Sequence, residues 1–283
     1  MTGQGPARKR VAFQGELGSY SDEAASRFFG EDFEPLPQRT LAAVFNAVES
    51  HRADAGVVPV ENSIEGSVGE AYDLLLSTGL RVVGEVYVRV VHCLVGLQES
   101  DLSTVRRVYS HPQALGQCRA WISVMGYEPI GFYDTAGAAR FVKESGDPTC
   151  AAIASERAAR IYGLRVLARG IEDYGRNYTR FLVIGRDPPQ PSKRTKTTVI
   201  FSVAHRPGSL YRALGPLAER GINLTKIESR PTRARPWQYH FFVDFEGSVE
   251  EDRVREALSE LSNHTLFLKV LGSYPMAQIE EVD

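Results

Sequence analysis

The sequence predicts an α/β protein in which two α/β lobes precede a smaller domain of the ferredoxin-like type. Short apolar strands alternate with amphipathic helices from Val11 onward, which is the pattern of α/β folds. After a proline-rich segment the remaining elements follow in the order βαββαβ, the ferredoxin-like arrangement. We therefore expect a two-lobed domain at residues 8–185, a linker at 186–196 and a second domain at 197–275.

The composition of the 283 residues excludes several classes of partner. Lys and Arg number 33 and Asp and Glu 35, so the net charge of -2 gives no basic footprint for a nucleic acid. Cys93, Cys118 and Cys150 are odd in number, far apart and set in apolar surroundings, which favours reduced structural thiols and no metal site. The chain has no leader-like start and no run of about 18 uncharged apolar residues. We expect a cytoplasmic protein without a membrane partner.

The first strand and helix meet at a glycine-rich turn. Residues 11–13 are apolar and run into Gly15-x-x-Gly18, after which Ser19 or Ser21 caps a helix. Such a turn exposes backbone N–H groups to anions. It lacks the three-glycine spacing of dinucleotide loops, so no nucleotide cofactor is expected.

The next elements complete the first lobe. Thr40 begins a helix whose apolar side chains recur at the spacing of a packed face, and residues 55–60 form a nearly all-apolar strand that ends in a polar cluster. The valine-rich residues 81–95 predict one or two extended strands. This segment is long enough to carry the chain into a second lobe.

Polar groups directly follow the predicted strands of the second lobe as well. The strand at residues 105–109 leads into His111, and the strand at 128–132 leads into a helix opened by Asp134. His111 is either an acid or base or, as is more usual before proline, a hydrogen-bonding structural residue.

A strand returns the chain to the first lobe at residues 181–184, an apolar run closed by Gly185. Asn177, Thr179 and Arg180 stand at its start, and ligands of open α/β sheets bind at strand ends. The sequence thus predicts a hinged cleft for a small anionic molecule. The alternative is an ordinary β-forming threonine beside a surface cation.

Motifs in this order resemble a prephenate dehydratase followed by an ACT regulatory domain, and the resemblance spans almost the whole chain. In the first domain they are Gly15-x-x-Gly18-Ser19-Tyr20-Ser21, Val58-Pro59-Val60-Glu61-Asn62-Ser63, Ser110-His111-Pro112-Gln113, Asp134-Thr135-Ala136-Gly137 and Asn177-x-Thr179-Arg180-Phe181. In the second they are Gly221-Ile222-Asn223-Leu224 and Glu228-Ser229-Arg230-Pro231. The resemblance implies a catalytic domain of the periplasmic-binding-protein type. Only ten residues precede the first strand, so no chorismate mutase domain is expected.

The resemblance also implies the reaction, in which prephenate loses carbon dioxide and its ring hydroxyl to give phenylpyruvate in L-phenylalanine biosynthesis. Aromatisation drives this step, so no cofactor is expected. The resemblance implies that the hydroxyl of Thr179 assists the departure of the ring hydroxyl. Because threonine does not titrate near neutrality, we expect a positioned hydrogen-bond donor.

The remaining site residues are carried over from the matching motifs. The expected substrate-binding residues are Asn62, Ser63, Ser110, Gln113, Gln117, Thr135, Ala136, Gly137 and Arg180, with Glu61, Asn177 and Phe181 in support. Neighbouring side chains of a regular strand point to opposite faces. Arg180 therefore binds the same substrate as Thr179 only if the strand is irregular, and otherwise it is a structural clamp.

The ACT resemblance implies an L-phenylalanine effector and pairing across subunits, so a homodimer or homotetramer is expected. The expected effector-binding residues are Gly208, Ser209, Leu210, Asn223, Leu224, Glu228, Ser229 and Arg230. The phenol of Tyr211 falls near this expected pocket, and residues 228–230 alternatively just end a strand. Removal of everything beyond Lys193 is expected to leave a desensitised catalyst.

Two other functions stay open at this point. Arogenate dehydratase differs by an amino group in place of the keto group of the substrate, and nothing in the sequence decides between them. A non-catalytic amino-acid sensor is possible because two-lobed clefts and ACT domains both occur in binding proteins. The intact Asn177-x-Thr179-Arg180-Phe181 motif argues against a sensor.

Overall fold

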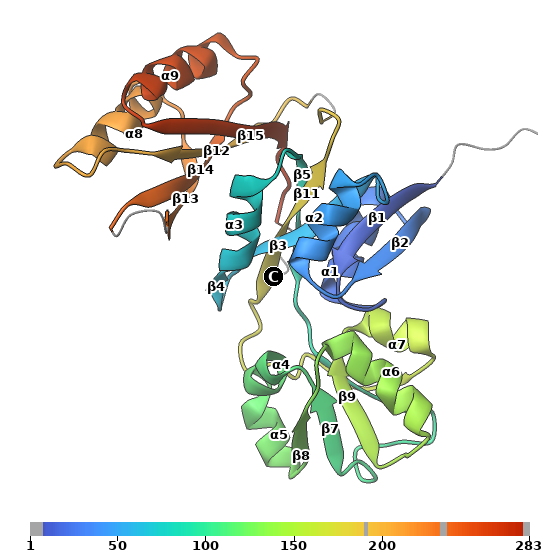
Figure 1. Cartoon of the computed structure of the whole chain (residues 1–283). Helices are drawn as coiled ribbons and strands as arrows, with labels where there is room; N and C mark the ends of the chain where they lie inside the picture. The colour runs from blue at the N-terminus through green and yellow to red at the C-terminus, as the bar shows by residue number, and fades with distance from the viewer. Residues whose placement is uncertain (1–7, 190–191, 233–236, 280–283) are drawn as a thin grey trace, which may run out of the picture.

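Three separate sheets organise the computed structural model, which describes residues 8–189, 192–232 and 237–279 (Figure 1). The first lobe occupies the middle of Figure 1, the second lobe lies below it in green, and the C-terminal domain lies above in orange and red. The α/β fold with two lobes and a C-terminal βαββαβ domain is confirmed. Within the described residues, no helix has both the length and the apolar character needed to span a membrane.

The first lobe is built on the sheet order β2-β1-β3-β11-β5, with β4 paired to β3. Its elements are β1 (Lys9–Gln14), α1 (Tyr20–Phe29), β2 (Phe33–Gln38), α2 (Leu41–Glu49), β3 (Ala55–Asn62), β4 (Gly66–Ser67), α3 (Gly69–Ser77), β5 (Arg81–Arg89) and β11 (Tyr178–Gly185). Strand β11 runs antiparallel to both of its neighbours. The predicted return of the chain to the first lobe thus places β11 between β3 and β5.

The second lobe has the sheet order β10-β6-β9-β7-β8. Its elements are β6 (Cys93–Gly96), β7 (Arg107–Ser110), α4 (Pro112–Gln117), α5 (Arg119–Met125), β8 (Glu128–Gly131), α6 (Thr135–Ser145), β9 (Cys150–Ala154), α7 (Glu156–Tyr162) and β10 (Arg165–Arg169). Two segments cross between the lobes, residues 90–92 and 170–177. The three cysteines are buried and free, and burial raises the pKa of the Cys93 thiol to about 11.

The C-terminal domain is a four-stranded antiparallel sheet in the order β13-β14-β12-β15. Its elements are β12 (Thr195–Ser202), α8 (Ser209–Glu219), β13 (Leu224–Pro231), β14 (Tyr239–Glu246), α9 (Asp252–Asn263) and β15 (Phe267–Pro275). Because strand side chains alternate, one face of this sheet packs on α8 and α9 through residues such as Val199 and Phe245. The opposite face is free to pack on the first lobe.

This opposite face shares a hydrophobic core with the first lobe. Ile200, Phe242 and Leu271 lie in the same buried cluster as Leu75 and Leu182. Strand β15 approaches β5 in Figure 1, and α3 lies beside β13. Removal of the C-terminal domain would uncover this core, so the desensitised catalyst expected after truncation beyond Lys193 would expose apolar surface of the first lobe.

The close approach of β15 to β5 depends on a glycine. A Cβ atom placed on Gly272 would lie 2.2 Å from the carbonyl oxygen of Val82, a distance that no real side chain tolerates. Gly272 therefore lets the two backbones meet, and the C-terminal domain is docked on the lobe instead of hanging from its linker.

Candidate active site

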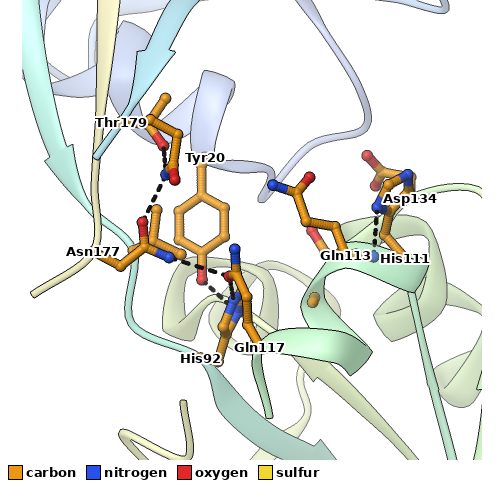
Figure 2. Close-up of a pocket in the computed structure, with 12 residues that line it drawn as sticks. Tyr20, His92, His111, Gln113, Gln117, Asp134, Asn177 and Thr179 are labelled. Atoms are coloured by element: carbon orange, nitrogen blue, oxygen red, sulfur yellow. Dashed lines mark hydrogen bonds between the residues drawn. The ribbon is translucent and has the colours of Figure 1, made fainter. Parts of the chain in front are cut away.

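A cavity of about 200 Å³ lies between the two lobes, where polar side chains converge (Figure 2). It is lined by Tyr20, Asn62, Val90, His92, His111, Gln113, Ala114, Gln117, Asp134, Thr135, Asn177 and Thr179. The first lobe contributes the end of β3 and the start of β11, and the second contributes α4 along its length and the start of α6. The polar strand ends that the sequence predicts do meet at one place.

Thr179 and Asn62 are direct neighbours across the antiparallel pair β11 and β3. The amide of Asn62 donates from Nδ2 to Oγ1 of Thr179 at 3.0 Å. Its other atom, Oδ1, accepts from the backbone N–H groups of Ile64 and Glu65 at 3.0 and 2.9 Å, which fixes the orientation of the amide. Among the described residues the Thr179 hydroxyl accepts this hydrogen bond and donates to no other group, so its hydrogen is available to a molecule in the cavity.

A chain of hydrogen bonds runs from this pair across the cleft. Asn62 donates to Oδ1 of the buried Asn177 at 2.6 Å, and Asn177 donates to Oε1 of Gln117 at 3.1 Å. Gln117 comes from α4 of the second lobe, and its Nε2 donates to the carboxylate of Glu65 at 3.2 Å. The chain therefore fixes the relative position of the two lobes beside the cavity.

The same chain defines the protonation of His92. Its Nε2 lies 2.9 Å from Oε1 of Gln117, which can only accept, so Nε2 carries the hydrogen. Its Nδ1 lies 3.1 Å from the hydroxyl of Tyr20. Burial lowers the pKa of His92 and raises that of Tyr20. Both side chains are therefore neutral walls of the cavity near pH 7.

The opposite wall is made by two helix starts. The Asp134 carboxylate accepts from the backbone N–H of Gly137 at 2.8 Å and caps α6, and burial raises its pKa. His111 caps α4 by accepting from the N–H of Gln113 at 3.3 Å. His111 thus makes the hydrogen bond expected of a structural residue, and it also lines the cavity, as an acid or base would.

The structure does not bring every expected substrate-binding residue to the cavity. Asn62, Gln113, Gln117 and Thr135 line it. Ala136 and Gly137 are buried in α6, and Phe181 is buried in the core of the first lobe.

Two expected serines serve the backbone. Ser110 is fully buried and donates to the carbonyl of Ile153 at 2.6 Å. Ser63 donates to the carbonyl of Arg176 at 3.2 Å and accepts from the N–H of Tyr178. Neither lines the cavity, so in this structure both are framework residues.

The expectation that Arg180 binds the substrate is wrong for this structure. Its guanidinium is 5 % exposed and lies on the face of β11 opposite the cavity, against the C-terminal domain. It donates to Glu85 at 2.8 Å, to Asp244 and to the hydroxyl of Tyr274 at 3.1 Å. Alternation along the strand explains the result, because Thr179 takes the cavity side. Arg180 is the structural clamp of the second alternative.

Motif reasoning missed His92. The residue lies in a valine-rich segment whose composition is typical of a protein core. The presence of a histidine inside this apolar run was the sequence signal that could have identified it. The segment proves to be the first crossing between the lobes, which places His92 at the floor of the cleft.

A larger hollow of about 830 Å³ adjoins the cavity and shares Tyr20, His111, Asp134 and Thr135 with it. Its lining includes Arg39 and Arg140, whereas the residues that line the smaller cavity include neither Lys nor Arg. Within the described residues, no group of three or more His, Cys, Asp or Glu could hold a metal ion. The cleft therefore offers a compartment without Lys or Arg beside a hollow of mixed charge, where Arg39 and Arg140 lie with Glu16.

The residues expected to bind an effector do not converge within one chain. Ser209 and Leu210 line a hollow of about 170 Å³ in the C-terminal domain, next to the left-handed Gly208. Leu224 packs toward the domain core, and Asn223 and Ser229 are exposed.

Glu228 and Arg230 face the first lobe instead. Glu228 accepts from Ser67 at 2.6 Å, and Arg230 contacts Asp73 at 3.3 Å. The side chain of Tyr211 is 81 % exposed and leaves the hollow open.

Comparison with known proteins gives one family for each part of the chain. Residues 11–189 match the prephenate dehydratase family and residues 197–263 match the ACT domain family. A bifunctional chorismate mutase/prephenate dehydratase of Aquifex aeolicus is 44% identical over 96% of this chain and 75% of its own length. Arogenate dehydratase/prephenate dehydratase 2 of Arabidopsis thaliana is 43% identical over 95% of this chain and 74% of its own.

Solved structures agree over nearly the whole chain. A prephenate dehydratase from Arthrobacter aurescens, in complex with L-Phe, superposes with a TM-score of 0.85 at 32% identity, covering 94% of this chain and 90% of its own. GqqA, described as a novel type of quorum quenching acylase, superposes with a TM-score of 0.87 at 40% identity, covering 95% and 98%.

Proposed function

Because the chain belongs to the prephenate dehydratase family and carries an ACT domain, we propose that the cleft between its lobes is the catalytic site and that Thr179 acts on the leaving hydroxyl. The reaction is the decarboxylating dehydration of prephenate to phenylpyruvate, water and carbon dioxide in L-phenylalanine biosynthesis. The observation that carries the proposal is the hydrogen bond from Asn62 to Thr179 at the cavity wall, which fixes the threonine oxygen there as an acceptor and leaves its hydrogen for a molecule in the cavity.

The proposed step needs a hydrogen-bond donor at the ring hydroxyl of the substrate. At the opposite end of the ring it needs little stabilisation of the negative charge of the ring carboxylate. The bond from carbon to the ring hydroxyl breaks as that oxygen accepts the hydrogen bond of Thr179. The bond to the ring carboxylate breaks at the same time, and its electron pair completes the aromatic ring. The leaving hydroxide takes a proton from the solvent and becomes water, and the carboxylate leaves as carbon dioxide. Orientation of the donor carries the effect, since threonine does not titrate near neutrality.

The charge distribution of the cleft fits the two carboxylates of prephenate. The compartment beside Thr179 is lined by amides, hydroxyls, two histidines and Asp134 and has no Lys or Arg, so a carboxylate there gains little as an anion and is lost more readily as neutral gas. The second carboxylate, on the side chain, then faces the adjoining hollow with Arg39. Glu61, which points to the ACT domain, and Asn177 support the donor pair.

Arogenate is the alternative substrate, because relatives with both names are equally similar to this chain. An acylase is a weaker alternative, supported by the likeness to GqqA. Acyl transfer by Thr179 requires a base that removes its hydrogen, whereas Asn62 donates to its oxygen. We therefore favour the dehydratase.

Regulation and assembly complete the proposal. L-Phenylalanine, found in the complex from Arthrobacter aurescens, is the proposed effector of the ACT domain, in a homodimer or homotetramer. The proposed catalytic domain is residues 8–185 and the proposed ACT domain is 197–275, with a linker at 186–196 whose last two residues already belong to β12. The buried free thiols favour a reducing, cytoplasmic location.

The test is an assay of phenylpyruvate formation from prephenate, with and without L-phenylalanine, and with arogenate in a parallel reaction. Efficient turnover of prephenate supports the proposal. If arogenate is turned over with a much higher kcat/KM, the alternative substrate is correct. If neither compound reacts, the proposal fails.

A further inference from the structure

The strand pair that carries the proposed catalytic residues has a second face. Asn62 pairs with Thr179 across β3 and β11, and the next register pair is Glu61 with Arg180. Because side chains alternate along each strand, the first pair faces the cavity and the second faces the ACT sheet. Each catalytic residue is thus joined by one peptide bond to a residue that contacts the ACT domain.

Arg180 is held by a buried charge cluster. It contacts Glu85 of β5 at 2.8 Å and Asp244 of β14, and Lys196 of β12 contacts Glu85 at 2.8 Å. These side chains are at most 6 % exposed. Tyr274 adds a hydrogen bond to Arg180 at 3.1 Å. Such a network tolerates little movement, since every displaced charge loses its partner in a place that water does not reach.

Among the described residues of the ACT domain, Lys226 is the one that pairs with Glu61. The Lys226 ammonium of β13 lies 2.8 Å from the Glu61 carboxylate and 5.7 Å from the ring centre of Tyr72. The side chain of Lys226 is 10 % exposed. This lysine therefore ties the edge of the ACT sheet to the residue next to Asn62.

The pairing of β11 with β3 is irregular just where these contacts act. The register shifts between Arg180 and Phe181, so the ladder that aligns the buried part of the two strands does not extend evenly to Thr179. Strand β11 keeps its pairing with β5 through Thr179, and the contacts of Lys226 and Asp244 constrain the irregular pairing with β3 from the far face.

We propose that Lys226 and Asp244 of the ACT domain are positioning residues for the dehydratase reaction, acting on Asn62 and Thr179 through Glu61 and Arg180. The proposal rests on the proposed role of Thr179. It makes the ACT domain a part of the catalytic geometry even without an effector. The structure also supplies a matched control in Lys269 of β15, whose ammonium donates to the carbonyls of Leu76 and Thr78 at the end of α3, another ACT contact on the same lobe.

The test compares Lys226→Met, Lys226→Arg and Lys269→Met by steady-state kinetics on prephenate in the full-length protein. Methionine keeps the unbranched length of lysine and removes the charge. We expect Lys226→Met to lower kcat about tenfold while KM changes less than about twofold, because the donor is misplaced and the binding groups remain. Lys226→Arg restores most of the rate, and Lys269→Met stays within about twofold of the wild-type kcat.

Glu61→Gln removes the same ion pair from the catalytic side, which keeps the test decisive if Lys226→Met does not fold. We expect the same loss of kcat in Glu61→Gln, and no further loss when it is combined with Lys226→Met. A wild-type kcat in folded Lys226→Met or in Glu61→Gln would overturn the proposal. An equal loss in Lys269→Met would overturn it too, because docking in general would then explain the effect. An inactive wild type would count against the proposed function instead.

Discussion

The first lobe contacts the second lobe and the ACT domain through different kinds of side chain. Toward the second lobe it presents polar contacts, among them Asn177 with Gln117 beside the cavity and the buried Asp22 with Arg157 at 2.7 Å away from it. Toward the ACT domain it presents a continuous apolar core and the charge cluster around Arg180. The first interface leaves room for a small molecule, whereas the second holds two domains in one position.

A glycine permits close packing at both interfaces, but only the one at the lobe interface also needs a left-handed backbone. A Cβ on Gly18 would lie 2.6 Å from Cα of Ala158 in the second lobe, and Gly18 also has a left-handed φ of +87°. Gly272 needs only the close approach to Val82. The turn of Gly18 shapes a loop at the mouth of the cleft, and Gly272 brings two strands together.

The largest effect on stability is expected at the ACT interface. Glu85→Ala leaves Arg180 and Lys196 without their shared carboxylate in a buried place, so we expect the free energy of unfolding to fall by about 3–5 kcal/mol. Urea denaturation measures the loss. The control is Arg253→Gln, which breaks an exposed ion pair with Glu251 and should cost about 1 kcal/mol or less. A loss in Glu85→Ala no larger than in this control would remove the contrast between the interfaces.

A mutation at the lobe interface should show the reverse pattern. Gln117→Ala removes the acceptor of Asn177 and His92, and we expect kcat/KM on prephenate to fall about tenfold because these two groups beside the cavity lose their shared partner. Stability should fall by only about 1–3 kcal/mol. Gln98→Ala, which removes an exposed contact to the carbonyl of Gly163, is the control for both measurements. Unchanged kinetics in Gln117→Ala would show that this shared partner does not matter for the reaction.

The smallest effect is a pH dependence of stability at the lobe interface. Burial lowers the pKa of His92 in the folded protein, so the unfolded chain binds a proton at a higher pH than the folded one. The contribution of neutral His92 to the free energy of unfolding is present above the pKa of the unfolded chain, about 6.5. It is lost as the pH falls through the lower pKa of the folded protein. We expect Tm between pH 8 and pH 5 to decline less steeply in His92→Gln than in the wild type. Parallel curves would mean that His92 titrates equally in both states.

Sequence reasoning reached the elements that depend on local pattern. The apolar run at residues 181–184 predicted β11, and the polar strand ends predicted where the cleft lies. Strand β2 was not predicted, because Pro35 and Pro37 interrupt its pattern. Its place at the edge of the sheet explains why the prolines are tolerated.

The role of Arg180 could not be decided from the sequence for a physical reason. Its partners Glu85 and Asp244 lie 95 and 64 positions away, and the register shift after Arg180 is a property of the paired strands. The role of Ser110 could not be decided from the sequence either, since a hydroxyl in a matching motif can line the cavity or hydrogen-bond to the backbone. The sequence determines which groups are available, and only the fold decides which way they face.

The most direct test of the account is the kcat of Thr179→Ala and Thr179→Ser on prephenate, with circular dichroism to verify folding. If Thr179 is the positioned donor that Asn62 orients, alanine lowers kcat about 10²-fold or more, and serine, which keeps the hydroxyl, retains much of the rate. A folded Thr179→Ala with near-normal kcat would contradict the account.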